Sequence, residues 1–268
     1  MRTLITTFYA LLIFSSLLRS ADRPNFVWLI SEDNSKHFLK MFDEHGAETP
    51  RIAQLASHGL IFNHAFSNAP VCSVARTTLI TSCYGPRIGT QFHRRSVLVP
   101  MPDGLKMFPA YLRDAGYYTT NNRKKDYNAI EGPGVWDESS NRASWRNRKD
   151  DQPFFHMQSF GTSHESGLHF SQEVMSSQET KTDPASVFVP PMHPDTATFR
   201  YTYARYHDKI QTVDQQIGAV VDKLTNRSTR WPISASTASF HFSGILTTSG
   251  TCNPRSFAYP LLPGSTPP

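Results

Sequence analysis

The sequence predicts an α/β fold in which a mainly parallel sheet is flanked by helices. Short apolar runs alternate with amphipathic segments from residue 25 to residue 224, the order that parallel strands with helical crossovers require. Polar or charged side chains follow several of the apolar runs, and the carboxyl ends of parallel strands form one edge of a sheet, where ligands gather. We therefore expect one shared site built from Glu32, Asp33, Lys124 and His164.

The first predicted strand is Asn25–Ser31, a short apolar run rich in β-branched and aromatic residues. A helix is predicted over residues 50–59, where apolar residues recur at helical spacing, a proline stands first and a glycine last. The apolar run 60–62 then predicts the next strand. Residues 73–81 have the composition of a second helix.

The remaining elements continue the alternation. Residues 105–115 have helical spacing and are closed by a glycine, and residues 117–121 and 153–160 are typical of strands. Residues 202–224 form the clearest helix, because apolar side chains recur at steps of three and four along one face: Tyr206, Ile210, Val213, Ile217, Val220 and Leu224.

Composition indicates a folded chain with a basic surface. The 268 residues are 38% hydrophobic and 18% charged, with a formal net charge of +5. Such a surface attracts anionic partners, among them sulfated glycans, nucleic acid and membranes, although a merely solvated charge excess is the simpler interpretation. Only three cysteines occur, Cys72, Cys83 and Cys252, and an odd, small number argues against a disulfide framework.

The two ends of the chain differ from its middle. Residues 1–21 have the pattern of a secretory signal, with Arg2 before an apolar run that is too short for a comfortable membrane span. We therefore expect a secreted or periplasmic protein.

Residues 229–268 contain no Asp or Glu and are rich in Ser, Thr and Pro, so we expect a disordered tail. The abrupt change predicts that this tail is not native to the domain, which reading the coding DNA in its other frames would test.

The segment Pro70–Leu79 carries the most specific chemistry. Cys72 stands at the predicted start of a helix, where backbone N–H groups favour negative charge, and Arg76, one turn further on, can face the same point. This arrangement suits a nucleophile that acts on an anionic ester. The alternatives are an inert buried cysteine and a thiolate nucleophile of the phosphatase kind, whose arginine lies further along the chain.

Two further groups of residues have both a functional and an ordinary interpretation. Glu32 and Asp33 are adjacent carboxylates that could bind a hard cation such as calcium, or could form a helix cap or a solvated turn. Lys124 could be a surface charge and His164 a structural histidine. Each signal alone is weak.

Taken together, these segments resemble the sulfatase family of the alkaline-phosphatase-like superfamily. Cys72–Arg76 resembles the family's core signature, a cysteine followed by an arginine four residues later, and Gly85–Gly89 resembles its second half. Further resemblance is carried, in the expected order and spacing, by Asn25–Asp33, Thr49–Phe62, Arg123–Asp126 and Pro153–His164. The resemblance extends from about Arg23 to Leu224.

The resemblance implies a fold and a domain organisation. The fold would be an alkaline-phosphatase-like sandwich with a mainly parallel central sheet flanked by helices, here truncated. Residues 1–21 would be the signal peptide, residues 22–228 an incomplete N-terminal sulfatase domain, and residues 229–268 the tail.

The resemblance also implies a reaction, the hydrolysis of sulfate esters. A maturation enzyme would oxidise Cys72 to formylglycine, whose hydrated aldehyde offers one hydroxyl to attack sulfur and a second to expel sulfate. Arg76 would hold this group and offset its charge. Lys124 would bind sulfate oxygens, and His164 would protonate the leaving oxygen or donate to the sulfate.

The resemblance further implies a calcium ion held by Glu32, Asp33 and the group at position 72. The chain departs from the family pattern at several points: Glu32 and Asp126 stand where Asp and His are usual, and Val74 where Pro or Ala is usual. The family's later metal ligands, expected after the long helix, are not found. We therefore expect an incomplete metal site.

The leading functional hypothesis is a secreted sulfuric-ester hydrolase, with sulfated polysaccharides among its candidate substrates. A related phosphoesterase or phosphonate hydrolase on the same fold is one alternative, and an inactive, truncated remnant is another. The expected partners are a sulfated small molecule or glycan and the formylglycine-generating enzyme. We expect no nucleic-acid partner and no stable membrane anchor.

Overall fold

The computed structural model describes residues 23–94, 97–225, 233–239 and 243–248, and all structural statements below concern this part of the chain. One sheet runs through it in the order β2-β7-β6-β1-β5-β3-β4. All neighbours from β6 to β4 pair in parallel, whereas β7 is antiparallel to both β6 and β2. The prediction of a mainly parallel sheet flanked by helices is confirmed.

The strands are β1 (Asn25–Ser31), β2 (Gly59–Phe62), β3 (Tyr118–Asn122), β4 (Glu138–Ser140), β5 (Phe154–Phe160), β6 (Ile233–Ser239) and β7 (Ser243–Thr248). The α-helices are α2 (Pro50–Ala56), α3 (Cys72–Thr81), α4 (Gly85–Ile88), α5 (Phe108–Asp114), α6 (Gln172–Ser177) and α7 (Ala197–Thr225). Short 3₁₀ turns are η1 (Lys36–Phe38), η2 (Trp145–Asn147), η3 (Gly161–Ser163) and η4 (Glu165–Leu168).

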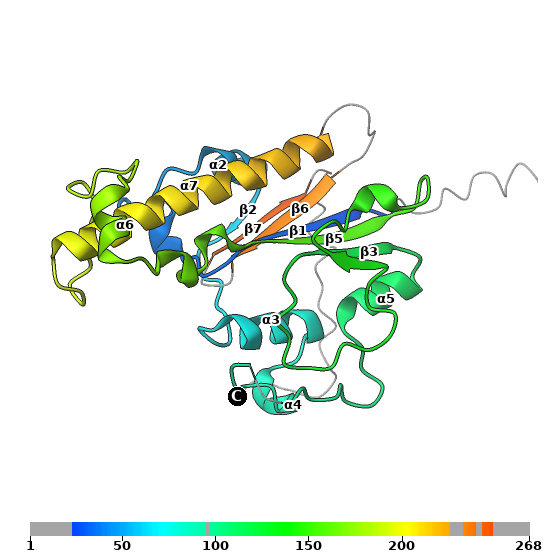
Figure 1. Ribbon diagram of the computed structural model, residues 1–268. Coiled ribbons are helices and arrows are strands. Elements are labelled where there is room, and N and C mark those ends of the chain that lie inside the picture. Colours follow the sequence, from blue (N-terminus) through cyan, green and yellow to red (C-terminus); the bar gives the residue numbers. More distant parts are fainter. Residues whose placement is uncertain (1–22, 95–96, 226–232, 240–242, 249–268) are drawn as a thin grey trace, which may run out of the picture.

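Helices cover both faces of the sheet. Figure 1 shows α2 and α7 along one face and α3, α4 and α5 on the other. Strand β1 serves both layers because successive side chains point to opposite faces. Val27 and Leu29 pack in the cluster that contains Ile217 of α7, whereas Ile30 packs with Ala75 of α3 in the opposite cluster.

The predicted helices and strands are found, with shifted ends. Helix α7 begins at Ala197 rather than at residue 202, because the apolar face of the long helix continues through Tyr201. Helix α5 begins at Phe108 rather than at residue 105, because Pro109 suits the first turn of a helix and fixes the start there. The short elements α4, β4 and α6 were not predicted.

The tail differs in part from its composition-based prediction of disorder. Strand β6 pairs with β1 over Asn25–Ser31, and β7 pairs with both β6 and β2. Ladder hydrogen bonds join backbone groups, so these strands need no alternating apolar pattern to pair. The rest of the tail and the predicted signal peptide, residues 1–21, lie outside the described residues, and the non-native origin of the tail stays a prediction.

Among the described residues, no helix is both long enough and apolar enough to cross a lipid bilayer.

Candidate active site

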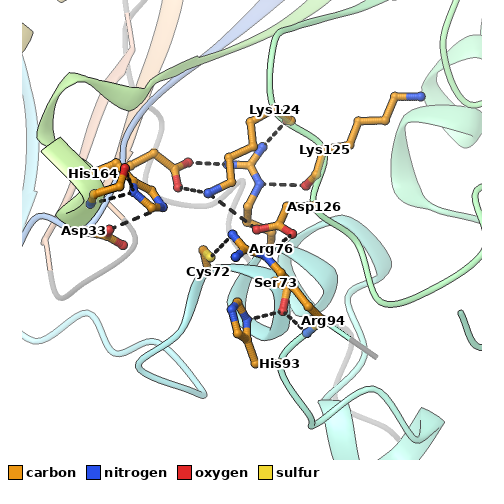
Figure 2. Close-up of polar contacts among 12 residues, drawn as sticks. Asp33, Cys72, Ser73, Arg76, His93, Arg94, Lys124, Lys125, Asp126 and His164 are labelled. Carbon is orange, nitrogen blue, oxygen red and sulfur yellow. Dashed lines mark hydrogen bonds and ion pairs between the residues drawn. The ribbon is translucent and has the colours of Figure 1, made fainter. Parts of the chain in front are cut away.

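The candidate site lies where β1, β3 and β5 end, opposite the start of α3. Because these strands are parallel neighbours, the residues that follow them reach one edge of the sheet. Glu32 follows β1, Lys124 follows β3 and His164 follows β5. Cys72, at the start of α3, faces the same region, and Figure 2 shows Cys72, Lys124 and His164 around a common space. The predicted convergence is thus present.

Cys72 is the first residue of α3. The preceding residue, Val71, is extended and caps the helix with no side-chain hydrogen bond, so the first N–H groups of the helix remain oriented toward the site. The Cys72 residue is only 7% exposed, and its Sγ lies 3.8 Å from Nη2 of Arg94.

Arg76 is buried and organises the loop after β3. Its Nη1 lies 2.8 Å from Oε1 of Glu32, an ion pair in which both side chains are 1% exposed. Its Nε donates to the carbonyl of Lys125 at 2.8 Å, and its Nη2 donates to the carbonyl of Lys124. These contacts fix the backbone that carries Lys124.

Both carboxylate oxygens and the backbone carbonyl of Glu32 have partners. Its second carboxylate oxygen, Oε2, lies 2.6 Å from Nζ of Lys124, so each oxygen has its own cation. Its carbonyl accepts a hydrogen bond from the hydroxyl of Ser163. Burial lowers the pKa of Lys124, but the attraction and hydrogen bond of Glu32 outweigh this effect and the net pKa is raised. Lys124 therefore stays charged at neutral pH.

Asp126 links the loop to the cysteine. Its carboxylate lies 3.3 Å from Nε of Arg94 and 3.5 Å from Nζ of Lys124. Burial raises the pKa of Asp126, but hydrogen bonds from Cys72 and Arg94 and the nearby cations outweigh burial and lower it. Asp126 is therefore a carboxylate at neutral pH and can accept a proton from the group at position 72.

The same surroundings raise the pKa of the Cys72 thiol. Burial is the largest cause and the hydrogen bond to Asp126 the second, while Lys124 and Arg94 act in the opposite direction. An unmodified Cys72 is therefore a neutral thiol at pH 7 and a poor nucleophile. This environment disfavours the thiolate hypothesis.

Asp33 and His164 form the opposite wall. The backbone N–H of Glu165 donates to Oδ2 of Asp33 at 2.8 Å, and Nε2 of His164 lies 3.7 Å from the same oxygen. The N–H of Ser166 donates to Nδ1 of His164, so the neutral ring carries its proton on Nε2, toward Asp33.

Backbone conformation is unusual at this edge. Asp33, Arg94, Arg123 and Asp126 all have positive φ, from 44° to 88°, a region that residues other than glycine adopt infrequently. Such conformations persist where surrounding contacts enforce them, often at functional sites. Here the ion pairs of Asp126 and the Glu165 N–H bond to Asp33 supply such contacts.

The space between these walls is a cleft of about 570 Å³. Cys72, His93 and Arg94 form one side, and Asp33, His164 and Glu165 the other. His93 contacts the helix start through a 2.8 Å hydrogen bond to the Ser73 hydroxyl. The cleft thus presents several cationic or proton-donating groups to a ligand near Cys72, as an anionic ester requires.

The donors for a metal ion are few. Carboxylate oxygens of Glu32 and Asp33 and a ring nitrogen of His164 lie within 4.8 Å of one another; Cys72 is outside this described group. Calcium takes about 6–8 oxygen ligands, whereas Glu32 already pairs both oxygens with cations. The described residues alone do not fit a complete calcium site.

Arg94 and Glu165 contribute to the site although the sequence alone does not identify them. Arg94 lies in a basic segment beside His93, and nothing in its spacing connects it to Cys72. Glu165 follows His164 directly and reaches Asp33 through its backbone. Asp126 was noted only as a departure from a family pattern, and its contact with Cys72 depends on the fold of the β3 loop.

Comparisons with known proteins point to one family. Residues 24–149 match the sulfatase family model. The chain is 31% identical over 249 aligned residues to an ulvan-active sulfatase from Formosa agariphila, covering 77% of this chain and 41% of that protein. It is 32% identical over 103 residues to human N-acetylgalactosamine-6-sulfatase, covering 35% of this chain and 20% of that enzyme. The chain thus spans less than half the length of these relatives.

Structural similarity extends further along the chain. A structure from Bacteroides fragilis assigned to the sulfatases superposes with a TM-score of 0.67 at 16% identity. The superposition covers 87% of this chain and 70% of that one. At this identity the likeness concerns the fold, and it confirms the alkaline-phosphatase-like arrangement expected from the sequence.

Proposed function

We propose, from the premise that residues 24–149 carry the domain of the sulfatase family, that this chain is the N-terminal portion of a sulfuric-ester hydrolase. The observation that supports the proposal most directly is the position of Cys72. It opens α3 inside a cleft whose walls also carry Arg94 and His164, with Lys124 and Asp126 behind it.

The residue at position 72 is the proposed nucleophile. A formylglycine formed there from Cys72 would supply a hydrated aldehyde, in which one hydroxyl attacks sulfur and the other allows sulfate to leave. The Cys72 side chain lies at the wall of an open cleft and beside a carboxylate, so the residues present fit such a group. Its formation requires a maturation enzyme as partner.

The surrounding side chains would bind the sulfate and move protons. Lys124 and Arg94 place positive charge beside position 72 and stabilise the charge on the sulfate oxygens. Asp126, a carboxylate at neutral pH, accepts the proton of the attacking hydroxyl. His164, with its proton on the Nε2 side, donates to the leaving oxygen. Arg76 positions Lys124 through the carbonyls that it binds.

The calcium ion that the family resemblance implies would rest on Glu32 and Asp33. These two carboxylates supply too few oxygens for the usual calcium shell, and Glu32 is paired with Arg76 and Lys124. We therefore assign the ion no step in the reaction. Positive charge at the sulfate is assigned to Lys124 and Arg94 alone.

The proposed substrates are sulfate esters of small molecules or glycans. The similarity to the ulvan-active sulfatase supports a sulfated polysaccharide. The predicted signal peptide would direct export to the periplasm or the outside of the cell. There the protein would meet such a substrate.

A specific observation also favours a second candidate, an inactive sulfatase-like remnant. Strand β6 is parallel to β1 and ends beside Ser31 in register. The residues after β6 would therefore reach the site, and the family's later metal ligands are expected after the long helix. The sequence has no Asp or Glu after residue 228 to fill that role. Calcium titration with a thermal melt tests the cation site, because a ligand that binds the folded state raises the melting temperature. A rise that Asp33→Asn abolishes speaks against the remnant, whereas a fully converted residue 72 without any sulfate-ester turnover favours it.

Turnover of 4-methylumbelliferyl sulfate tests the activity directly. The full chain is produced with a formylglycine-generating enzyme, alongside Cys72→Ala and the matched control Cys83→Ala. Cys83 is the other buried free cysteine among the described residues and lies beyond the end of α3. The proposal predicts turnover in the wild type and in Cys83→Ala and none in Cys72→Ala. Equal turnover in both variants, or faster turnover of the matching phosphate ester, would contradict it.

A further inference from the structure

A second cavity opens beside the cleft on the side of α7. It has a volume of about 260 Å³ and shares Asp33, Phe38 and Glu165 with the cleft. The shared residues make the two spaces neighbours, so a ligand can extend from one into the other. The volume lies just below the ~300–1,000 Å³ of typical small-molecule sites, which suits one ring rather than an extended chain.

Aromatic rings form about half of the described lining of this cavity. Phe38 contacts Tyr206 edge-on with centroids 4.5 Å apart, and His193 stacks on Phe199 at 4.8 Å. The ring nitrogen Nδ1 of His193 lies 2.9 Å from the hydroxyl of Tyr203. Tyr206 donates its hydroxyl proton to the carbonyl of Asp33. These contacts fix a rigid aromatic surface next to the cleft.

The polar groups of the cavity are carboxylates, hydroxyls and the ring of His193, and no lysine or arginine is among its described lining residues. Asp33 and Glu165 contribute the carboxylates; Oδ2 of Asp33 accepts the N–H of Glu165, and Oε2 of Glu165 lies 2.8 Å from Nε2 of His169. Carboxylates repel an anionic group and accept hydrogen bonds from hydroxyls. The cleft beside it has the opposite character, with Arg94 and three histidines in its lining.

We infer that this cavity is a subsite for a neutral sugar ring that neighbours the sulfated unit of a glycan. A pyranose ring has an apolar C–H face, which packs on aromatic rings, and a rim of hydroxyls, which donate to carboxylates. The inference rests on the proposed function, because the sulfated unit would occupy the cleft. It adds that the adjoining unit carries neither sulfate nor carboxylate.

Ligand-observed NMR titration of the full chain tests the subsite without any turnover. The probes are methyl glycosides of galactose, glucose, mannose and xylose, with the methyl glycosides of galacturonate and glucuronate as anionic counterparts. At least one neutral glycoside is expected to bind, and the uronates more weakly than their neutral counterparts. Binding by none of the neutral glycosides, or tighter binding of the uronates, would overturn the inference.

Two variants locate the binding. Phe199→Ala is expected to weaken binding of the neutral glycoside about fivefold through lost aromatic packing. The matched control is Phe188→Ala, since Phe188 also stacks on a histidine, His45, at 4.2 Å, but lines neither cavity. Equal effects of the two variants contradict the assignment.

The charge of Glu165 is tested by Glu165→Gln, at an exposed side chain. This variant should reduce the ratio of affinities for neutral over anionic glycosides. An unchanged ratio counts against the role of the Glu165 charge.

The same preparations separate this inference from the proposed function. Glycoside binding that depends on Phe199, in a chain that does not turn over 4-methylumbelliferyl sulfate, would leave the subsite standing and remove the sulfatase activity. Turnover of 4-methylumbelliferyl sulfate without glycoside binding would support the sulfatase activity and remove the subsite.

Discussion

At the residue scale, the surroundings of Cys72 separate two kinds of chemistry. Burial and the neighbouring Asp126 raise the pKa of the thiol, which is the opposite of what a thiolate nucleophile needs. The same carboxylate suits a hydroxyl at this position, because a hydroxyl needs an acceptor for its proton. The site is therefore better matched to a modified residue 72 than to the cysteine itself.

Alkylation by iodoacetamide reports on this environment in the unmodified chain. In a background of Cys83→Ser and Cys252→Ser, the label reaches Cys72 alone. The raised pKa predicts slow labelling at neutral pH and an increase only well into the alkaline range. Asp126→Asn removes a cause of the raised pKa while Lys124 and Arg94 remain, so labelling at pH 8 should be faster than in the wild type.

Asp222→Asn is the control for the charge change, since Asp222 pairs with Arg51 near the end of α7. Labelling that is as fast in the wild type as in Asp126→Asn would show that Asp126 does not control the thiol.

At the element scale, the long helix α7 supports both the core and a second helix. Helix α2 begins after Thr49, which provides no side-chain cap. Instead Asp214 of α7 accepts the N–H groups of Arg51 at 3.2 Å and Ile52 at 2.8 Å. A carboxylate from one helix thus caps the start of another, and this contact ties α2 to α7.

Removing this cap should weaken the fold measurably. Asp214 is buried, so Asp214→Ala leaves two N–H groups without their acceptor and should lower the free energy of unfolding by about 2 kcal/mol. Asp214→Asn keeps one acceptor and should cost less. Urea unfolding measures both, with Asp222→Ala as the control, because an exposed ion pair contributes about 0–1 kcal/mol. A loss no larger than that of the control would refute the capping role.

The sequence predicted the elements better than the contacts between them. Periodicity located α7, and the run Asn25–Ser31 located β1, because a buried face imposes its pattern directly on the residues. The prediction that residues after β1, β3 and β5 converge also succeeded, because parallel strands have one carboxyl edge. The pairing of Glu32 with both Arg76 and Lys124 could not be predicted, since it depends on the tertiary position of the β3 loop.

At the scale of the whole molecule, the sheet buries a histidine that limits stability in acid. His156 lies in β5, is 1% exposed, and contacts the hydroxyl of Thr120 at 2.7 Å. Burial lowers its pKa to about 4, although the hydrogen bond to Gln158 opposes the shift. The folded chain therefore keeps this imidazole neutral at pH values where the unfolded chain binds a proton.

The sign of the resulting pH dependence follows directly. Above the ordinary histidine pKa of about 6.5 the ring is neutral in both the folded and the unfolded state, so its titration does not change the free energy of unfolding. As pH falls below that value only the unfolded chain gains the proton, so the free energy of unfolding should drop by about 3 kcal/mol by pH 4. His156→Gln should flatten this part of the profile, whereas the exposed His58→Gln should not. Parallel profiles for the wild type and His156→Gln would contradict the assignment.

The proposed chemistry depends on the chemical state of residue 72, which can be measured together with activity. Peptide mass spectrometry across Cys72 measures the fraction converted to an aldehyde in preparations made with and without the maturation enzyme, and the same preparations are assayed for sulfate-ester turnover. We expect turnover in proportion to the converted fraction and none from the unmodified thiol. Full turnover by a chain whose Cys72 remains an unmodified thiol would contradict it.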